Sequence, residues 1–319
     1  MSKFLVTGGA GFIGSHIVDR LVADGEDVRV IDNLSTGKLA NMEHNLDKID
    51  FRQESLTDLS VVRNVVDGVD YIIHQAAIPS VPRSVADPIA SNDAGINATL
   101  NLLVAAKDAG VKRVVYASSS SVYGNSPTLP KHEKMGTNPL SPYALTKLAG
   151  EHYLRIFTEL YGLETVSLRY FNVFGPRQDP GSQYAAVIPK FITLIARGER
   201  PVIYGDGQQS RDFTYVSNNV NANLLACTAP GVAGHVFNIA CGERFSLLDL
   251  VDAINRILGT SIEPILEDER PGDVKHSLAD ISKAREAMGF EPIITFTEGL
   301  ERLVRWTVES QSQPQRTSP

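Results

Sequence analysis

The sequence predicts an α/β protein: a doubly wound parallel sheet with a smaller, less regular C-terminal substrate domain. Strand and helix patterns alternate through the first half, which is typical of parallel strands joined by crossover helices. A glycine-rich turn follows the first apolar run. Beyond Asn172 the sequence becomes richer in Pro and Gly, with weaker alternation. With 319 residues the chain is long enough for two domains that share a cleft.

The strands and helices of the first half are short and regularly spaced. The expected strands are 4–7, 28–31, one that includes Phe51, 71–74 and 114–117, and the expected helices are 12–21 and 92–109. Gly110 suits the end of the second of these helices. The tail from Ser310 has few apolar residues, so residues 310–319 are expected to be disordered.

A further helix has clear start and stop signals. Ser141 suits the N-cap, and Pro142 suits the first helical position, where the missing N–H costs nothing. The apolar pattern continues to Gly162, which suits the C-cap. Tyr143 and Lys147 are therefore expected one turn apart on a single face of this helix.

Composition excludes several classes of function. Apolar residues make up 43% and charged residues 21% of the chain, which is ordinary for a globular protein, and the net charge of −7 argues against binding to nucleic acids. No stretch approaches the roughly 18 apolar residues of a membrane span. Cys227 and Cys241 form no C-x-x-C pair and are expected as buried apolar side chains, and the seven histidines show no metal spacing. We expect a cytoplasmic protein with no metal, membrane or nucleic-acid partner.

The glycine turn predicts a dinucleotide site. Gly8, Gly11 and Gly14 follow a strand and open a helix, the context in which this pattern is credible as a Rossmann fingerprint. The glycines permit a tight turn and a close approach of the backbone. The N-terminus of the helix offers free N–H groups and a partial positive charge to a pyrophosphate.

An acidic residue at the end of the second strand favours NAD over NADP. Asp32 lies about 20 residues after the glycines, where a carboxylate binds ribose hydroxyls and repels a 2′-phosphate. Its neighbours Asn33, Leu34 and Ser35 include no Arg that would reverse this preference. Asp58 has two readings that the sequence leaves open: a contact to the adenine amine, or the N-cap of a helix.

A Tyr–Lys pair predicts proton transfer. A free tyrosine has a pKa near 10, so a base at neutral pH needs this pKa lowered by about three units, on the order of 4 kcal/mol. Nearby positive charge from Lys147 and a nicotinamide ring could supply this in a dry site. Of the ten tyrosines only Tyr143 has a Lys four residues later. The serines at 118–121 follow the fifth strand at the ligand-binding edge, where a hydroxyl can share a proton with a substrate alcohol.

Four motifs together resemble the extended short-chain dehydrogenase/reductase family. They are Thr-Gly-Gly-Ala-Gly-Phe-Ile-Gly, Ser-Ser-Ser-Ser-Val-Tyr-Gly, Tyr143-Ala-Leu-Thr-Lys147 and Arg169-Tyr-Phe-Asn-Val-Phe-Gly. Within that family the chain is similar to the NAD-dependent UDP-sugar 4-epimerases, from Lys3 to about Trp306. The resemblance implies that hydride passes from sugar C4 to bound NAD, the 4-keto sugar turns over, and hydride returns to the opposite face.

The resemblance also implies roles for individual residues. Tyr143 would be the base on the 4-hydroxyl, Lys147 its electrostatic partner and a ligand of the nicotinamide ribose, and Ser119, with Ser120 as a second candidate, the hydroxyl that bridges to the 4-oxygen. The implied cofactor contacts are Gly8, Gly11, Phe12, Ile13, Gly14, Asp32, Asn33, Asp58, Leu59, Ala76, Ala77, Tyr143, Lys147 and Phe171. The implied substrate contacts are Ser119, Ser120, Tyr143, Asn172, Val187, Tyr204, Arg211, Arg270, Asp273 and Ser277.

Within these sets the resemblance assigns particular groups. Asn172, Arg211 and Arg270 would hold the diphosphate, although the two arginines also fit a surface role. Asp273 would hold the uridine ribose, and Phe171 would lie beside the nicotinamide.

The resemblance divides the chain into two discontinuous domains. Residues 1–172 with about 216–241 would bind NAD, and 173–215 with 242–309 would bind the UDP-sugar. A homodimer would form through helices 92–109 and 143–161 in a four-helix bundle. One departure concerns the helix after the fourth strand, where many members have Asn-Val-x-Gly-Thr and this chain has Gly95-Ile-Asn-Ala-Thr99.

The choice among neighbouring activities depends on few residues. Dehydratases typically have Asp-Glu, and decarboxylases usually have a Glu, where this chain has Ser120 and Ser121. Epimerisation needs neither of these acidic residues. Ser277 is small enough to leave room for a 2-acetamido group, and the loop around Arg83 resembles that of enzymes acting on UDP-N-acetyl sugars. We therefore expect both plain and N-acetylated UDP-hexoses as substrates. The alternatives are UDP-glucuronate 4-epimerisation, another nucleotide-sugar dehydratase or reductase, and a non-catalytic NAD sensor.

Overall fold

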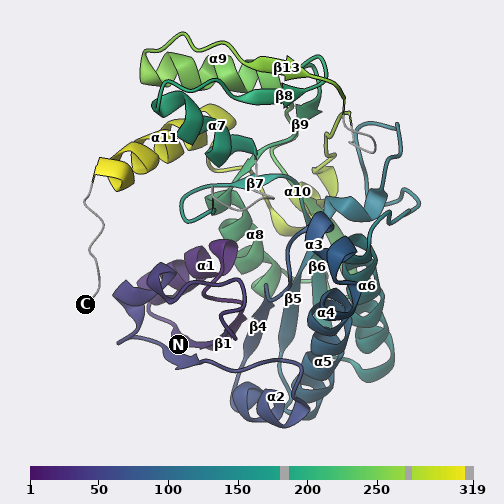
Figure 1. Ribbon diagram of the computed structural model, residues 1–319. Coiled ribbons are helices and arrows are strands. Elements are labelled where there is room, and N and C mark those ends of the chain that lie inside the picture. Colours follow the sequence, from purple (N-terminus) through teal and green to yellow (C-terminus); the bar gives the residue numbers. More distant parts are fainter. Residues whose placement is uncertain (180–186, 270–274, 313–319) are drawn as a thin grey trace.

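The computed structural model describes residues 1–179, 187–269 and 275–312. Its centre is a seven-stranded sheet with the order β11-β6-β5-β4-β1-β2-β3, in which every pairing is parallel (Figure 1). The strands are β1 (Lys3–Thr7), β2 (Asp27–Ile31), β3 (Asp50–Arg52), β4 (Tyr71–His74), β5 (Arg113–Ser119), β6 (Glu164–Tyr170) and β11 (His235–Ile239). Because β1 lies between β2 and β4, the sheet reverses its winding there and leaves a crevice at the carboxyl ends of these strands. The predicted doubly wound fold is confirmed.

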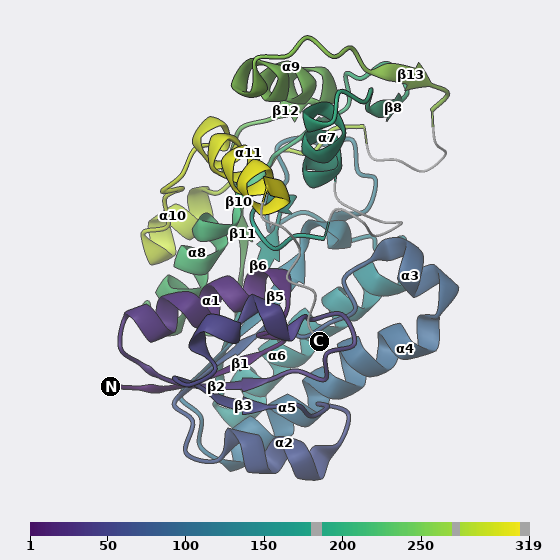
Figure 2. The same ribbon diagram turned by 60° about the vertical axis from the view of Figure 1, so that its left-hand side comes forward.

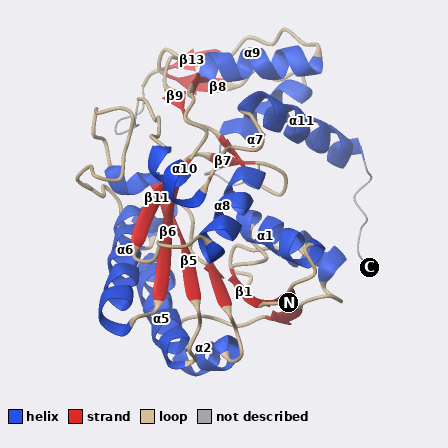
Figure 3. Cartoon of the chain, turned by 180° about the vertical axis from the view of Figure 1, so that it is seen from behind, coloured by secondary structure: helices blue, strands red, loops and turns tan. Residues whose placement is uncertain are grey.

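Alternating side chains of the strands enter two different cores. Phe4 and Val6 pack in one buried cluster with Ile17 and Val220, whereas Leu5 packs in another with Leu102. The first cluster lies under α1 (Phe12–Ala23) and α8 (Val216–Thr228). The second lies under α2 (Leu59–Val66), α5 (Ala98–Asp108) and α6 (Pro142–Tyr161). Figure 3 shows the two helical layers from behind.

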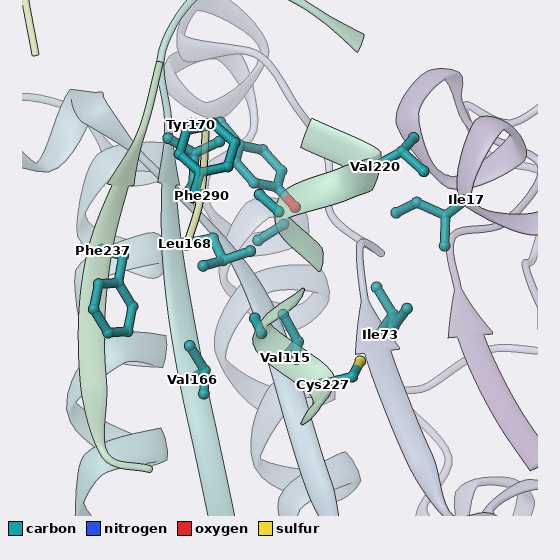
Figure 4. Close-up of a cluster of buried hydrophobic side chains, with 14 of the residues drawn as sticks. Ile17, Ile73, Val115, Val166, Leu168, Tyr170, Val220, Cys227, Phe237 and Phe290 are labelled. Carbon is teal, nitrogen blue, oxygen red and sulfur yellow. The ribbon is translucent and has the colours of Figure 1, made fainter. Parts of the chain in front are cut away.

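The first cluster holds one of the two cysteines. Cys227 of α8 is buried beside Ile73 and Val115 of the sheet, as predicted (Figure 4). Cys241 differs, because it is only partly buried and its Sγ accepts a hydrogen bond from Asn218 Nδ2 at 3.6 Å. Both thiols are free.

The helix expected at 92–109 begins earlier and is not regular. It consists of α4 (Pro88–Asn92), one π-helical turn η3 (Asp93–Asn97) and α5 (Ala98–Asp108). Asp87 caps the start by accepting a hydrogen bond from Ala90 N at 2.9 Å, and Pro88 follows at the first helical position. Apolar periodicity over this stretch did not indicate the π turn, because such a turn contains one extra residue and has no distinctive amino-acid composition.

The remaining elements form a second lobe with its own core. Its helices are α7 (Val187–Ala196), α9 (Leu247–Leu258) and α11 (Phe296–Ser312), and its strand pairs are β7 (Val173–Phe174) with β10 (Thr214–Tyr215), β8 (Val202–Tyr204) with β13 (Ile265–Glu267), and β9 (Ser210–Arg211) with β12 (Phe245–Ser246). Figure 2 shows α7, α9, α11 and the β8–β13 pair gathered apart from the large sheet. The helix α11 extends three residues into the segment expected to be disordered from residue 310. Among the described helices none combines the length and the hydropathy that a membrane crossing needs.

Short elements complete the chain. They are η1 (Leu39–Asn41), η2 (Glu43–Asn45), α3 (Val81–Ala86), η4 (Ser120–Tyr123) and α10 (Ser282–Met288).

Candidate active site

The glycine turn connects β1 to α1 at the switch point of the sheet. Gly8 has φ +69°, and a Cβ on it would lie 2.7 Å from Ala76 N, so only glycine fits. A Cβ on Gly14 would lie 2.2 Å from Gly8 O, so the start of α1 packs directly on the turn. Gly11 is the N-cap of α1, and no side chain among the described residues caps that end of the helix. Its N–H groups are therefore available to an anion.

A cavity of about 480 Å³ opens in front of this helix end. Its lining residues come from the glycine turn, the ends of β2, β4 and β5, the loop 54–57, the π-helical region and α6. They include the predicted contacts Gly8, Gly11, Phe12, Ile13, Gly14, Asp32, Asn33, Ala76, Ala77, Tyr143 and Lys147. The structure thus brings most of the predicted cofactor contacts to one cavity of a size that suits a bound cofactor.

Asp32 occupies the position expected of the ribose-binding carboxylate. Its Oδ2 accepts a hydrogen bond from Ala10 N at 3.0 Å and its Oδ1 one from Leu34 N at 2.8 Å. Burial raises the pKa of Asp32, and the backbone hydrogen bonds from Leu34 and Ala10 act in the opposite direction. Each oxygen keeps a second lone pair for a ligand hydroxyl. The backbone thus orients the carboxylate without saturating it.

Asp58 lies outside the cavity lining, and its Oδ1 has one of the two roles that the sequence allowed, which is to cap a helix. Its carboxylate accepts hydrogen bonds from Ser60 N at 2.8 Å and Val61 N at 3.4 Å and caps α2, which begins at Leu59. The cavity is lined instead by the preceding residues 54–57. The sequence alone did not indicate a role for this loop, and the only available signal was its position after the third strand. Asn101 holds it by donating to the carbonyls of Leu56 and Thr57 at 3.0 and 3.1 Å.

The helix of the Tyr–Lys pair has the boundaries that the sequence predicts. Ser141 accepts a hydrogen bond from Ala144 N at 3.1 Å as N-cap, and Gly162 ends the helix with φ +72°. Tyr143 and Lys147 both line the cavity. Lys147 Nζ lies 5.9 Å from the centroid of the Tyr143 ring and donates to Ala117 O at 2.7 Å. The ammonium is thus fixed between the helix and the end of β5.

Burial shifts the pKa values of both members of the pair. Burial raises the pKa of Tyr143, and a hydrogen bond with the Ser119 side chain acts in the opposite direction. Burial also lowers the pKa of Lys147 to about 7. The protein groups alone therefore do not acidify the phenol. For Tyr143, desolvation exceeds the effect of the Ser119 hydrogen bond, and sequence spacing could not reveal this burial.

Ser119 lies at the end of β5 beside Tyr143. Its Oγ accepts hydrogen bonds from Ser121 N at 3.2 Å and from Ser121 Oγ at 2.9 Å, so Ser119 also caps the short turn η4. Ser120 is partly buried and follows directly in that turn. The serine loop therefore has an internal hydrogen-bond pattern rather than being only a polar surface.

A buried ion pair behind this site was missed. Glu151 follows Tyr143 and Lys147 at the same four-residue spacing on α6, and it accepts from Ser118 Oγ at 2.5 Å and pairs with Arg169 of β6 at 2.7 Å. Both charged side chains are only 5% exposed. Their pairing across two elements had no local signal beyond the spacing along α6.

The substrate-side residues lie mostly in the second lobe. Asn172 has φ +34°, and its Nδ2 donates to Asp212 O at 3.1 Å and Ser277 Oγ at 3.3 Å. Arg211 Nη1 donates to Ser210 O at 3.0 Å and to Lys275 O at 3.2 Å. The structure thus brings Asn172 and Ser277 together and places Arg211 in the neighbouring strand β9.

The other predicted contacts are more widely spread. Phe171 is buried, with its ring 6.3 Å from that of Tyr123, so its side chain packs in the core and is outside the cavity lining. Val187 begins α7 and Tyr204 ends β8, both partly buried. Arg270 and Asp273 lie outside the described residues.

This fold and this geometry define a class of enzymes in which a dinucleotide at the switch point exchanges a hydride while a tyrosine of an adjacent helix transfers a proton. A family model described as the NAD dependent epimerase/dehydratase family matches residues 4–240. The chain belongs to this family, and the prediction of NAD as cofactor is confirmed.

Individual relatives match over nearly the full chain. The putative UDP-glucose 4-epimerase of Methanocaldococcus jannaschii is 41% identical, with 95% of this chain and 97% of the relative covered. The structure of the UDP-N-acetylglucosamine 4-epimerase from Methanobrevibacter ruminantium, in complex with UDP-N-acetylmuramic acid, is 46% identical with a TM-score of 0.93 and covers 97% of this chain and 99% of its own. That of the UDP-glucose 4-epimerase from Thermotoga maritima with UDP-glucose is 38% identical with a TM-score of 0.92 over the same shares.

Proposed function

We propose that this chain is a UDP-hexose 4-epimerase that inverts C4 reversibly through a transient 4-keto sugar with tightly bound NAD. The observation that carries the proposal is that Tyr143 and Lys147 line the dinucleotide cavity, with Ser119 hydrogen-bonded to Tyr143. The names of the relatives support the reaction and the UDP-sugar. The proposed substrates are the UDP-glucose/UDP-galactose pair and the corresponding N-acetylated pair.

The residues at the switch point fit NAD. The turn at Gly8 and Gly14 admits no side chain, the α1 N-terminus faces the cavity, and Asp32 offers two lone pairs to ribose hydroxyls. When bound, NAD accepts the hydride from C4 and returns it, and its oxidised ring contributes positive charge. The additional contacts proposed are Phe12, Ile13, Asn33, Ala76 and Ala77 at the cavity, together with Asp58, Leu59 and Phe171.

Tyr143 takes the proton of the sugar 4-hydroxyl and returns it. Because burial raises the pKa of the phenol, its acidity must come from positive charge close by. Lys147 and the oxidised nicotinamide ring would together supply this charge. The phenol would therefore be acidified when the cofactor is ready to oxidise the sugar. A phenolate beside Lys147 in turn favours the protonated form of the amine. Ser119 would donate its one hydroxyl proton to the phenolate of Tyr143 or to the 4-oxygen, whichever of the two accepts.

Epimerisation is favoured over elimination by the residues at η4. Ser120 and Ser121 are hydroxyls where the dehydratases and decarboxylases described above have carboxylates, so an acid–base pair for removing water is missing from this turn. A non-catalytic NAD sensor needs neither Tyr143 nor Lys147, and both are positioned in the cavity. UDP-glucuronate 4-epimerisation is the second candidate.

The UDP-sugar is proposed to bind between the two lobes. Asn172, Arg211 and Arg270 would hold the diphosphate, Asp273 the uridine ribose, and Ser120, Val187 and Tyr204 further parts of the substrate. Ser277, held near Asn172, leaves volume for an acetamido group. Residues 1–172 with 216–241 would act as the NAD unit and 173–215 with 242–309 as the sugar unit. Most of the second unit has its own core, although Ile281, Ala284 and Phe290 pack in the core of the large sheet.

We also infer a homodimer, joined through the region of α4, α5 and α6. Ile89, Leu145 and Leu160 are 74%, 53% and 70% exposed on α4 and α6, which is a large exposed apolar content for these helices. A Leu145→Glu variant should sediment as a monomer. The matched control is Leu266→Glu, which places the same charge at a 55% exposed leucine of β13 in the other lobe and should stay dimeric. Monomeric wild-type protein would contradict the inference.

A cytoplasmic location is proposed from the free thiols. Cys227 and Cys241 are both unpaired, as is usual for proteins of a reducing compartment.

The function is tested by product analysis of the purified protein. UDP-glucose, UDP-N-acetylglucosamine and UDP-glucuronate are supplied separately, without added nucleotide, and the products are resolved by NMR. The proposal expects the C4 epimers of the first two. Conversion of UDP-glucose alone would contradict the argument from Ser277, elimination products would contradict epimerisation, and conversion of UDP-glucuronate alone would establish the second candidate.

A further inference from the structure

The turn after β5 contains a second serine with a specific relation to Ser119. Both the backbone N–H and the hydroxyl of Ser121 donate to Ser119 Oγ, at 3.2 and 2.9 Å. Both serines are partly buried. One residue thus supplies two donors to a single oxygen beside the proposed base.

Counting lone pairs shows the consequence. A serine hydroxyl has two acceptor lone pairs and one proton. The two hydrogen bonds from Ser121 occupy both lone pairs of Ser119, so Ser119 can engage any further group only as a donor. The partner that the structure gives it on the other side is the Tyr143 side chain, with which Ser119 shares a hydrogen bond.

This direction matters for the proposed reaction. A hydroxyl that must donate can stabilise a phenolate or the oxygen of a keto sugar, both of which only accept. A hydroxyl with a free lone pair can instead accept a hydrogen bond from the neutral phenol or from the sugar alcohol. The phenol or the alcohol then points its proton at Ser119 and not along the path of proton transfer. Keeping Ser119 as a donor therefore stabilises the phenolate before hydride transfer and the keto oxygen after it.

We propose that Ser121 is a positioning residue that fixes the direction of the Ser119 hydroxyl. This inference rests on the proposed function and deepens it, because it concerns the same site. Ser121 acts through Ser119 and needs no contact with substrate.

The backbone of η4 allows a clean test. Removal of the Ser121 hydroxyl leaves the hydrogen bonds from Ser121 N to Ser119 Oγ, from Gly124 N to Ser121 O at 3.1 Å and from Asn138 N to Val122 O at 2.9 Å. The turn is thus retained while one of the two donors to Ser119 is lost. A Ser121→Thr variant retains the donor and serves as the conservative control.

The experiment is a double-mutant cycle on the holoenzyme, measuring kcat and KM for UDP-hexose epimerisation. Ser121→Ala should lower kcat about five- to tenfold, the size expected for one hydrogen bond, with little change in KM, and Ser121→Thr should stay close to wild type. In the Ser119→Ala background, Ser121→Ala should cause no further loss. An equal loss in both backgrounds, an effect on KM alone, or no loss at all would overturn the proposal.

A second readout does not need turnover. Phenolate absorbance is titrated in each variant, and the titration of the matching Tyr143→Phe variant is subtracted to isolate Tyr143. Ser121→Ala should raise the pKa of Tyr143, and Ser121→Thr should not. If the wild-type protein fails to epimerise UDP-hexoses, the proposed function fails, and this titration still decides the inference: an unchanged pKa of Tyr143 in Ser121→Ala overturns it.

Discussion

Gly95 of the π turn lies directly against the side chain of Thr146 on α6. A Cβ on Gly95 would lie 2.6 Å from Thr146 Cβ and 2.8 Å from its Oγ1. Thr146 is the residue next to Lys147, and its Oγ1 donates to Tyr143 O at 2.8 Å. Glycine therefore lets the π turn approach the helix at the Tyr–Lys pair. The Asn that many relatives in the resemblance have here would not fit against Thr146 without a shift of one element.

Gly95→Ala is expected to destabilise the protein and to impair activity. Overpacking at such a contact costs about 1–3 kcal/mol, and the strain falls on the turn of α6 that carries the pair. Urea unfolding measures the first effect and kcat the second. Gly136→Ala is the control, because a Cβ there has open space and the residue has no positive φ. Equal stability of the two variants would show that the π turn can move away from Thr146 with little cost in free energy.

Tyr143→Phe should lower kcat by about 10²–10⁴-fold, the usual contribution of a general acid–base group, while NAD stays bound. The ring remains and only the phenol oxygen is lost, so the fold should be unaffected. The measurement is the rate of UDP-glucose conversion together with the NAD content of the purified protein. Tyr161→Phe removes a phenol oxygen from the exposed end of the same helix and should leave the rate unchanged. A fully active Tyr143→Phe variant would exclude the phenol as the base.

Local signals predicted the parts of the site that lie within single elements. The cap at Ser141 and the stop at Gly162 are short-range effects, so the helix and the spacing of its Tyr–Lys pair could be placed from the sequence. The same holds for the turn at Gly8, whose positive φ only glycine adopts easily.

Features that depend on tertiary packing were not predictable in the same way. The contact of Gly95 with Thr146 joins two elements, and the π turn has the composition of an ordinary helix. The direction of the pKa shift of Tyr143 depends on burial, which spacing does not measure. Asp58 is an example of a local feature. Its capping of α2 was one of the roles that the sequence indicated, and the structure shows this cap.

His74 is expected to make the fold sensitive to acid. The ring is buried between Thr7 Oγ1 and Thr99 Oγ1, at 2.7 and 3.0 Å. Burial, with a smaller effect from the charge of Lys147, lowers the pKa of His74 to about 3. The unfolded chain therefore binds a proton below pH 6.5 that the folded chain does not, so this contribution to stability is complete above pH 6.5 and is lost as the pH falls towards 3.

The loss from His74 between pH 6.5 and pH 5 should be about 2 kcal/mol in the free energy of unfolding. Urea denaturation at several pH values should show a shallower pH dependence for His74→Gln, which keeps polar atoms near both threonines. His152→Gln removes an exposed imidazole from α6 and should retain the wild-type slope. If His74→Gln also retains that slope, His74 is protonated in the folded state.

Glu151→Gln should be among the most destabilising single changes near the site. The substitution leaves the buried Arg169 guanidinium, which lies 4.6 Å from the Tyr123 ring centroid, without its carboxylate. Loss of one partner of a buried pair costs about 3–5 kcal/mol, because the remaining charge stays desolvated.

The same helix offers the matched comparison for Glu151. Glu159 pairs with Arg155 at 2.6 Å, but these side chains are 54% and 48% exposed, so Glu159→Gln should cost only about 0.3–0.5 kcal/mol. Urea unfolding of both variants measures the difference directly. Replacing Glu151 and Arg169 together by apolar residues should recover part of the loss, since no unpaired charge remains. Equal destabilisation by Glu151→Gln and Glu159→Gln would mean that water reaches Arg169 and solvates it in the folded protein.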